Sequence, residues 1–253
     1  MLNHPTVSKL HTLRLTGMAA ALQEQSTQLD IDRLCFDERL GLLVDREASE
    51  RDSRRLKLRL SQARLRQSAC IEDIDYRTPR GLDRSLMATL ATGQWLRQHL
   101  NILITGKTGV GKSWIACALA NQACRLGFTA RYQRSDRLLT EINQARGDGR
   151  YTRLLAQTAK TDLLAIDDFC LGPWTDVARR DLLEILDDRH GNRSTIVVSQ
   201  LPVDHWHAAI GDPTLADAIL DRLVHNSYRI TLEGESKRRD AVPSLTNPSL
   251  ANA

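Results

Sequence analysis

The sequence predicts an α/β fold in which a parallel sheet is flanked by helices and preceded by a small all-helical region. Short, continuous apolar runs alternate with helical segments between residues 101 and 232. Such runs are typical of strands that are covered on both faces. A glycine-rich loop follows the first run and opens a helix. The chain up to about residue 90 shows apolar residues at helical spacing and no convincing strand.

Composition excludes several classes of protein. Of the 253 residues, 42% are hydrophobic and 26% are charged, which is unlike collagen-like, disulfide-scaffold and low-complexity chains. The formal net charge of +4 permits nucleic-acid binding without requiring it. The cysteines form no C-x-x-C pair, so we expect free thiols in a reducing compartment. The apolar runs are too short for a membrane span or a signal peptide, and we therefore expect a cytoplasmic protein.

The pattern divides the chain into two predicted domains, residues 1–75 and residues 76–253. In the first domain the helical spacing predicts an all-helical module, which we expect to bind a partner or DNA. The sequence TPRG at residues 78–81 interrupts this spacing. The second domain contains the alternating strands and helices.

Residues 51–66 of the first domain are strongly basic. The only acid among them is Asp52, while Leu56, Leu60 and Ala63 supply an apolar stripe, so an amphipathic helix is predicted. Its basic face is either solvated or in contact with a phosphate backbone, and spacing alone leaves both readings open. Because the chain has only three Phe, four Tyr and four Trp, base-stacking platforms are not expected. The predicted partner is duplex DNA, bound through its backbone by Arg54, Arg55, Lys57 and Arg59.

The segments of the second domain are predicted in order along the chain. The predicted strands are residues 101–105, 129–133, 163–166, 195–198 and 228–232. The predicted helices are residues 112–125, 137–146, 151–160, 176–190 and 215–224. In an open parallel sheet, ligands bind at the carboxyl ends of the strands. Polar residues that follow a predicted strand are therefore the candidates for a site.

The first strand leads into a phosphate-binding motif. Residues 106–113 read GKTGVGKS and fit G-x4-G-K-[ST]. Glycines let backbone N–H groups surround an anion, and the following helix adds its positive end. Lys112 is then placed at the β- and γ-phosphates, and the Ser113 hydroxyl ligates magnesium. The sequence predicts a site for ATP and Mg²⁺ whose nucleotide contacts are Gly106, Lys107, Thr108, Gly109, Val110, Gly111, Lys112, Ser113 and Trp114.

A pair of carboxylates follows the third strand. Four apolar residues lead into Asp167 and Asp168, which places both acids at the ligand-binding edge. Asp167 is expected to hold magnesium through its water shell, together with Ser113. Asp168 is expected to orient or deprotonate the attacking water.

Gln200 and Arg222 are weaker candidates. Gln200 ends the fourth strand, where a polar side chain either lies near the γ-phosphate or merely closes the strand. Arg222 lies on a predicted helix, where arginine is usually a solvated charge. Spacing alone does not decide either case.

The motifs together resemble a known family. GKTGVGKSWIACAL, DLLAIDDF, STIVVSQLP, ADAILDRLVHNSYRI and GESKR occur in this order and look like the IstB-type helper ATPases of bacterial insertion sequences. These are AAA+ proteins, close to helicase loaders of the DnaC type. The resemblance covers nearly the whole chain, including IEDIDYRTPRGLD. It implies a P-loop AAA+ sheet core, hydrolysis of ATP to ADP and phosphate, and ATP-dependent assembly on duplex DNA. It also implies a transposase as partner and a homo-oligomer with shared ATP sites.

The resemblance assigns further roles to individual residues. Residues 106–113 match the Walker A motif and residues 167–168 the Walker B motif. Gln200 matches the sensor-1 residue, Arg222 the arginine finger, and Arg238 is the nearest match to a sensor-2 arginine that contacts the nucleotide. The catalytic residues implied are Lys112, Asp168, Gln200 and Arg222. In three respects the chain departs from the common AAA+ pattern. Lys107 replaces a frequent proline, and the Walker B motif ends in Asp-Asp, as in IstB-like chains, where most AAA+ proteins have Asp-Glu. The chain after Leu232 is too short for a full C-terminal lid.

Four functions are weighed on this basis. The leading hypothesis is an ATP-dependent, DNA-binding helper of transposition. A replicative helicase loader of the DnaC type shares every nucleotide-site residue and differs in the partner of the N-terminal domain. A P-loop small-molecule kinase would need an acceptor site and an arginine-rich lid, and neither is evident. A nucleotide-binding scaffold without turnover is the remaining alternative.

Overall fold

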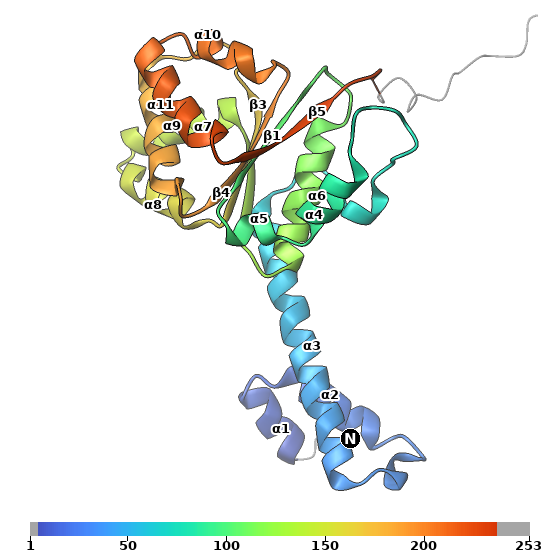
Figure 1. The fold of residues 1–253 in the computed structure, drawn as a ribbon. Helices are drawn as coiled ribbons and strands as arrows, with labels where there is room; N and C mark the ends of the chain where they lie inside the picture. The colour runs from blue at the N-terminus through green and yellow to red at the C-terminus, as the bar shows by residue number, and fades with distance from the viewer. Residues whose placement is uncertain (1–4, 237–253) are drawn as a thin grey trace, which may run out of the picture. The chain divides into compact units, whose positions relative to one another are not determined.

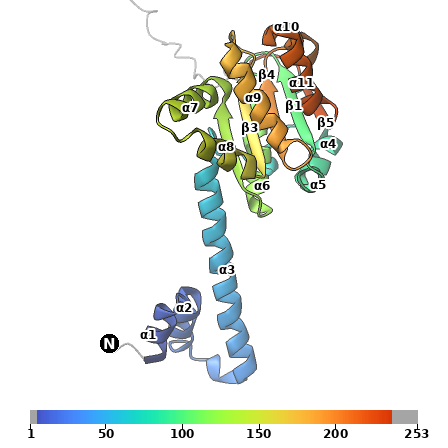
Figure 2. The same ribbon diagram turned by 90° about the vertical axis from the view of Figure 1, so that its left-hand side faces the viewer.

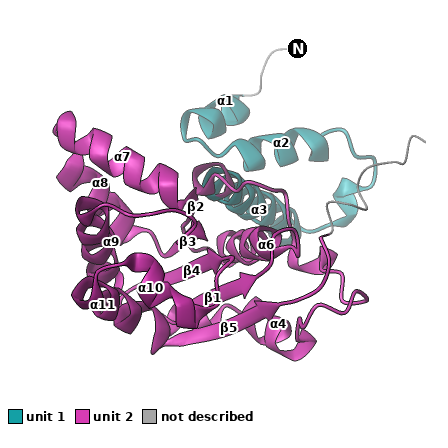
Figure 3. Ribbon diagram, turned by 90° about the horizontal axis from the view of Figure 1, so that it is seen from above, with its two compact units in different colours: residues 1–59 teal, residues 60–253 magenta. Residues whose placement is uncertain are grey.

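The computed structural model describes residues 5–236. The chain forms two compact units, unit 1 from residues 1–59 and unit 2 from residues 60–253 (Figure 3). The division into functional domains at residues 1–75 and 76–253 stays a prediction. Arg238 and all but the first four residues of the segment after Leu232, which is expected to be too short for a lid, lie outside the described residues.

Unit 1 consists of helices. They are α1 (Pro5–Thr12), α2 (Thr16–Gln25), the short 3-10 helix η1 (Ile31–Arg33) and most of α3 (Phe36–Ala63). The carboxylate of Glu47 on α3 accepts hydrogen bonds from the backbone N–H groups of Gly17 (2.7 Å) and Met18 (3.2 Å). These are orphan donors of the first turn of α2, so α3 caps α2. A Cβ at Gly17 would lie 2.8 Å from the Cα of Glu47, so a residue without a side chain is needed there.

Helix α3 differs from its prediction at its C-terminal end. The amphipathic helix predicted over residues 51–66 is the last part of this one long helix, which ends at Ala63. Arg64 adopts a left-handed backbone conformation with φ of 49°, and this conformation terminates an α-helix. Ala63 of the predicted apolar stripe is fully buried.

Unit 2 is built on a parallel sheet. Its strands in residues 60–236 are β1 (Asn101–Gly106), β2 (Ala130–Arg134), β3 (Leu163–Phe169), β4 (Ser194–Ser199) and β5 (Ser227–Leu232), in the order β2-β3-β4-β1-β5. Every pairing is parallel, as the apolar runs predict. β3 extends three residues beyond its predicted end at Ile166, and its register with β4 is irregular between Ile166 and Phe169. This irregularity falls at the two aspartates.

Helices cover both faces of the sheet. The helices of unit 2 that connect or precede the strands are α4 (Arg84–Ala91), α5 (Gln94–Arg97), α6 (Lys112–Arg125), α7 (Ser135–Gly147), α8 (Tyr151–Lys160), α9 (Asp176–Arg189), α10 (Trp206–Ile210) and α11 (Pro213–Val224), together with the short 3-10 helices η2 (Ile71–Asp73) and η3 (Val203–His205). Helix α6 packs against β1, β2, β3 and β4 and lies on the same face as α4 (Figure 1). Helices α7, α8 and α9 cover the other face, toward the viewer in Figure 2.

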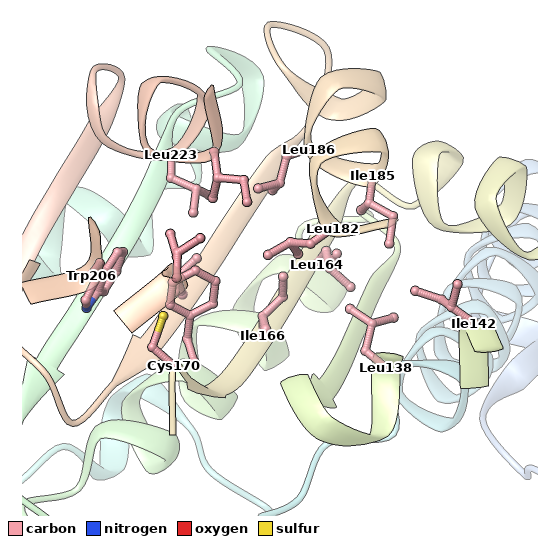
Figure 4. Close-up of a cluster of buried hydrophobic side chains, with 14 of the residues drawn as sticks. Leu138, Ile142, Leu164, Ile166, Cys170, Leu182, Ile185, Leu186, Trp206 and Leu223 are labelled. Atoms are coloured by element: carbon pink, nitrogen blue, oxygen red, sulfur yellow. The ribbon is translucent and has the colours of Figure 1, made fainter. Parts of the chain in front are cut away.

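A cluster of buried hydrophobic side chains lies on the face covered by α7, α9 and α11 (Figure 4). Leu164 and Ile166 of β3 meet Leu138 of α7 and Leu182 of α9 there. Burial of each such aliphatic side chain contributes about 1.5–3 kcal/mol. Trp206 is fully buried and donates its indole N–H to the carbonyl of Leu201 (3.0 Å). The cluster fixes β3 and β4, the strands that carry polar residues to the ligand-binding edge.

Across residues 5–236, the chain has no helix that combines the length and the apolar composition needed to cross a membrane.

Candidate functional site

The carboxyl ends of β1, β3 and β4 border a cleft of about 770 Å³. The predicted site residues that line this cleft are Thr108, Gly109, Gly111, Lys112, Ser113, Trp114, Asp167, Asp168 and Gln200. Three separate sequence motifs thus meet at one place, as expected for the edge of a parallel sheet.

The loop between β1 and α6 has the backbone of an anion-binding nest. Gly109 and Gly111 have positive φ angles of 87° and 98°, which residues with a side chain rarely adopt. A Cβ at Gly111 would lie 2.8 Å from the guanidinium of Arg80. Gly111 is also the N-cap of α6, so the positive end of that helix faces the loop.

Lys112 and Gln200 both contact this loop. The Lys112 ammonium donates to the backbone carbonyl of Lys107 (2.8 Å), and the residue is only 8% exposed. The Thr108 hydroxyl donates to the side-chain carbonyl of Gln200 (2.7 Å). The end of β4 is therefore joined to the phosphate-binding loop by a side-chain hydrogen bond.

Asp167 is buried and held by two donors. One Oδ accepts from the hydroxyl of Tyr132 on β2, and the other accepts from the N–H of Asp168 (2.9 Å). Burial, and secondly the hydrogen bond to Asp167, raises the pKa of Tyr132, so Tyr132 stays a neutral donor. The Arg66 guanidinium hydrogen-bonds to Tyr132, and this bond raises the pKa of Arg66. A cation therefore lies beside the Tyr132 hydroxyl.

Asp168 has a different partner. Its carboxylate lies 2.9 Å from Nε of Arg134, the last residue of β2. That Nε makes no hydrogen bond, so the contact is an ion pair. The side chain of Asp168 is 22% exposed, and its backbone φ is 56°, a left-handed conformation that aspartate tolerates better than most residues.

The donor set fits Mg²⁺. Magnesium prefers carboxylate, hydroxyl and water oxygens, and Ser113 and Asp167 offer a hydroxyl and a carboxylate in the same cleft. The glycine nest beside them suits phosphate oxygens, which commonly complete magnesium coordination in nucleotide sites.

Several residues around the cleft were not predicted from the sequence, among them Arg80, Tyr132 and Arg134. Arg80 is 5% exposed and donates to the carbonyls of Val110 (3.3 Å) and Asp75 (3.0 Å). It thereby ties the segment before α4 to the phosphate-binding loop. Arg134 ends a strand next to β3, and this position is a signal that the edge rule could have used. Tyr132 could be found only once β2 was known to pair with β3.

Arg222 lies elsewhere in unit 2. Its guanidinium pairs with Asp187 (2.7 Å) and Asp221 (3.1 Å), and its carbonyl accepts from the side chain of Asn101 at the start of β1 (2.9 Å). It is therefore at the amino ends of the strands, the edge opposite to the cleft. The structure does not bring Arg222 to the nucleotide site of its own chain.

The proposed DNA-contact residues lie on α3 in unit 1. Arg54 is 3.7 Å from Glu47, and Arg55 is 3.4 Å from Asp52. Lys57 is exposed, whereas Arg59 is partly buried. Part of the positive charge of this stretch is therefore balanced within the helix itself.

Comparison with known proteins connects this geometry to a family. Residues 8–242 match the family described as IstB-like ATP binding protein. An insertion-sequence ATP-binding protein of Sinorhizobium fredii, y4pL, is 54% identical over 95% of this chain and 98% of its own length. The ATP-binding protein of insertion sequence IS1162 from Pseudomonas fluorescens is 55% identical over 80% of this chain and 88% of its own length.

Solved structures share the fold at low sequence identity. The DnaC helicase loader has a TM-score of 0.54 and 16% identity, over 65% of this chain and 96% of that one. The replication initiator DnaA, bound to AMPPCP and single-stranded DNA, has a TM-score of 0.55 and 16% identity, over 68% of this chain and 52% of that one. These likenesses establish the AAA+ fold. With the phosphate-binding loop, the paired aspartates and a sequence match over residues 8–242 in agreement, the chain belongs to the IstB-like ATP-binding protein family.

Proposed function

We propose that this protein is an ATP-hydrolysing helper of transposition, which binds ATP and Mg²⁺, assembles on duplex DNA and cooperates with a transposase. The observation that carries the proposal is the cleft in which the glycine loop, both aspartates and Gln200 meet. Such a site positions a nucleoside triphosphate and supplies charged groups and proton acceptors near the γ-phosphate of that ligand.

Each side chain has a defined part in the proposed reaction. Lys112 lies inside the loop and neutralises charge on the β- and γ-phosphates. Ser113 and Asp167 would hold Mg²⁺, which when bound supplies positive charge to the phosphate oxygens. Asp168 orients the attacking water or accepts its proton. Gln200 accepts a hydrogen bond from Thr108 and would act between Mg²⁺, the attacking water and the γ-phosphate.

The DNA and transposase partners rest on different support. The relatives are described as proteins of insertion sequences, which favours transposition. The DnaC loader is 16% identical to this chain, and this likeness supports only a shared fold. No observation therefore favours helicase loading. The basic stretch of α3 offers candidates for contact with a phosphate backbone.

Replacement of Lys112 tests the nucleotide site. Lys112→Ala removes the buried ammonium and should weaken ATP binding by about 3 kcal/mol, roughly a hundredfold, as measured by titration with ATP and Mg²⁺. Lys107→Ala is the matched control, because Lys107 is an exposed lysine of the same loop and offers Lys112 only its backbone carbonyl. Equal ATP affinity in the wild type and Lys112→Ala would contradict the proposal, as would a wild type that binds ATP but releases no ADP with or without duplex DNA.

A further inference from the structure

A second cleft of about 590 Å³ lies in unit 2, away from the nucleotide site. Three segments line it: the chain around the end of α3, the start of β2, and α8 from Arg153 to its end at Lys160. Thr129 and Thr161, which precede β2 and β3, are among its residues. The cleft is therefore at the amino ends of the strands, while the nucleotide cleft is at their carboxyl ends.

The lining of this cleft is basic. Among residues 5–236, the charged residues that line it are Arg64, Arg131, Arg153 and Lys160, with no carboxylate. Arg131 is neutralised by Glu141, because its Nη2 donates to both carboxylate oxygens of Glu141, at 3.0 and 2.8 Å. Arg153 and Lys160 are exposed and make no ion pair within the part of the chain that the structure describes. The cleft thus keeps an excess of positive charge.

The spacing of the cations suits a polyanion. Arg153, Gln157 and Lys160 occupy positions i, i+4 and i+7 of α8, so they share one face of that helix. Seven residues of α-helix rise by about 10 Å, which is close to the axial rise of three nucleotides on one strand of duplex DNA, about 3.4 Å each. The amide of Gln157 lies between the two cations and can donate to a phosphate oxygen.

The neutral lining residues indicate contact with a backbone and not with bases. No aromatic side chain of residues 5–236 lines the cleft, so these residues offer no stacking platform for unpaired bases. Two flexible cations and an amide on one helix face are typical of sequence-independent phosphate contacts.

We infer that this cleft binds the phosphodiester backbone of duplex DNA, with Arg153 and Lys160 as the contacting cations. The inference rests on the proposed function and adds a DNA-binding surface on unit 2 to the candidate contacts Arg54, Arg55, Lys57 and Arg59 of α3. DNA bound at the amino ends of the strands leaves the nucleotide cleft accessible. Arg131 and Tyr132 are neighbours on β2, and Tyr132 bonds to Asp167, so one strand joins the two clefts.

The test measures how affinity for duplex DNA depends on salt. The full-length variant Arg153→Gln/Lys160→Gln and the wild type are titrated with a random-sequence duplex in the presence of ATP. Each lost phosphate contact lowers the slope of log affinity against log salt by about 0.9. Because two contacts are lost, the fall in DNA affinity between about 50 and about 200 mM salt should be about twelvefold smaller in the variant than in the wild type. The affinity for ATP should be unchanged.

A second variant separates local contact from overall charge. Arg180→Gln/Arg229→Gln removes the same charge from two exposed arginines of unit 2 outside the cleft, and it should keep the wild-type slope. A wild-type slope in the cleft variant would overturn the inference and leave the proposed function intact. An equal reduction of the slope in both variants would have the same two consequences. Failure of the wild type to bind duplex DNA at all would overturn both.

Discussion

At the scale of single residues, Asp167 and Asp168 have opposite surroundings although they are neighbours in the chain. Asp167 is 1% exposed and is fixed by the hydroxyl of Tyr132 and a backbone N–H. Asp168 is at the edge of the cleft, against Arg134. A carboxylate fixed by buried donors suits a static ligand role, whereas a partly exposed one can change partners and meet a water molecule.

Replacement of Asp168 tests this division of roles. Asp168→Asn keeps the shape of the side chain but removes its ability to accept a proton, so ATP binding should persist while turnover falls about a hundredfold or more. ADP release and an ATP titration measure the two quantities. Asp136→Asn is a matched control, because Asp136 also lies near Arg134 (3.2 Å) but its side chain is 60% exposed, and turnover should persist. Turnover near that of the wild type in Asp168→Asn would exclude the catalytic role.

The sequence predicted the motif residues of the cleft but not the residues that hold them. Asp167 follows the predicted third strand, Gln200 follows β4, and Lys112 ends the loop that follows β1. The edge rule therefore locates them without any knowledge of strand order. Tyr132 reaches Asp167 because β2 lies beside β3, with Arg134 opposite Asp167 in the register. Strand order is a long-range property that a local pattern does not contain.

At the scale of elements, the predictions succeeded where the hydrophobic pattern was long and failed where elements were short. The bounds of α6 and α8 agree with the prediction, and those of β1 agree to within a residue. The predicted segments include none of α4, α5 and α10, of which α5 and α10 span four and five residues. Periodicity cannot be recognised over so few residues. β3 was predicted too short because its last residues include two aspartates.

The cap that Glu47 provides to α2 gives a pH-dependent prediction. The hydrogen bond from Arg51, followed by the backbone N–H groups of Met18 and Gly17, lowers the pKa of Glu47 below 4.5 despite burial. A carboxylate with a lowered pKa in the folded state stabilises above its unfolded pKa, and this contribution is lost as pH falls through the folded value. Glu47→Gln should therefore speed hydrogen exchange in the first turn of α2 at neutral pH, and the difference from the wild type should shrink below pH 4.5.

A neighbouring glutamate provides the control for this prediction. Glu50 pairs with Arg46 (3.3 Å), and the side chains of Glu50 and Arg46 are 35% and 49% exposed. Glu50→Gln therefore removes only a surface ion pair of small energy. Its exchange rates in α2 should match those of the wild type. Equal protection of α2 in Glu47→Gln and Glu50→Gln at neutral pH would show that the cap does not stabilise the helix.

At the scale of the whole molecule, the sheet separates two sets of functional candidates. The nucleotide cleft is at the carboxyl ends of the strands, and Arg222 is at their amino ends beside Asn101. An arginine in that place can act on a γ-phosphate only if it belongs to another copy of the chain. The proposed homo-oligomer with shared ATP sites supplies such a copy, because a head-to-tail contact brings one edge of a subunit to the opposite edge of the next.

A mixing experiment with two inactive variants tests this arrangement. Arg222→Ala should bind ATP normally and hydrolyse it about a thousandfold more slowly, because an arginine finger stabilises transition-state charge. Lys112→Ala should be inactive for lack of nucleotide. In a mixture, pockets of Arg222→Ala subunits meet arginines of Lys112→Ala subunits, so part of the ATPase activity should return. Arg180→Ala, which removes an exposed arginine of α9, should hydrolyse ATP like the wild type. Wild-type turnover in Arg222→Ala alone would exclude the finger, and an inactive mixture under conditions of subunit exchange would contradict action between subunits.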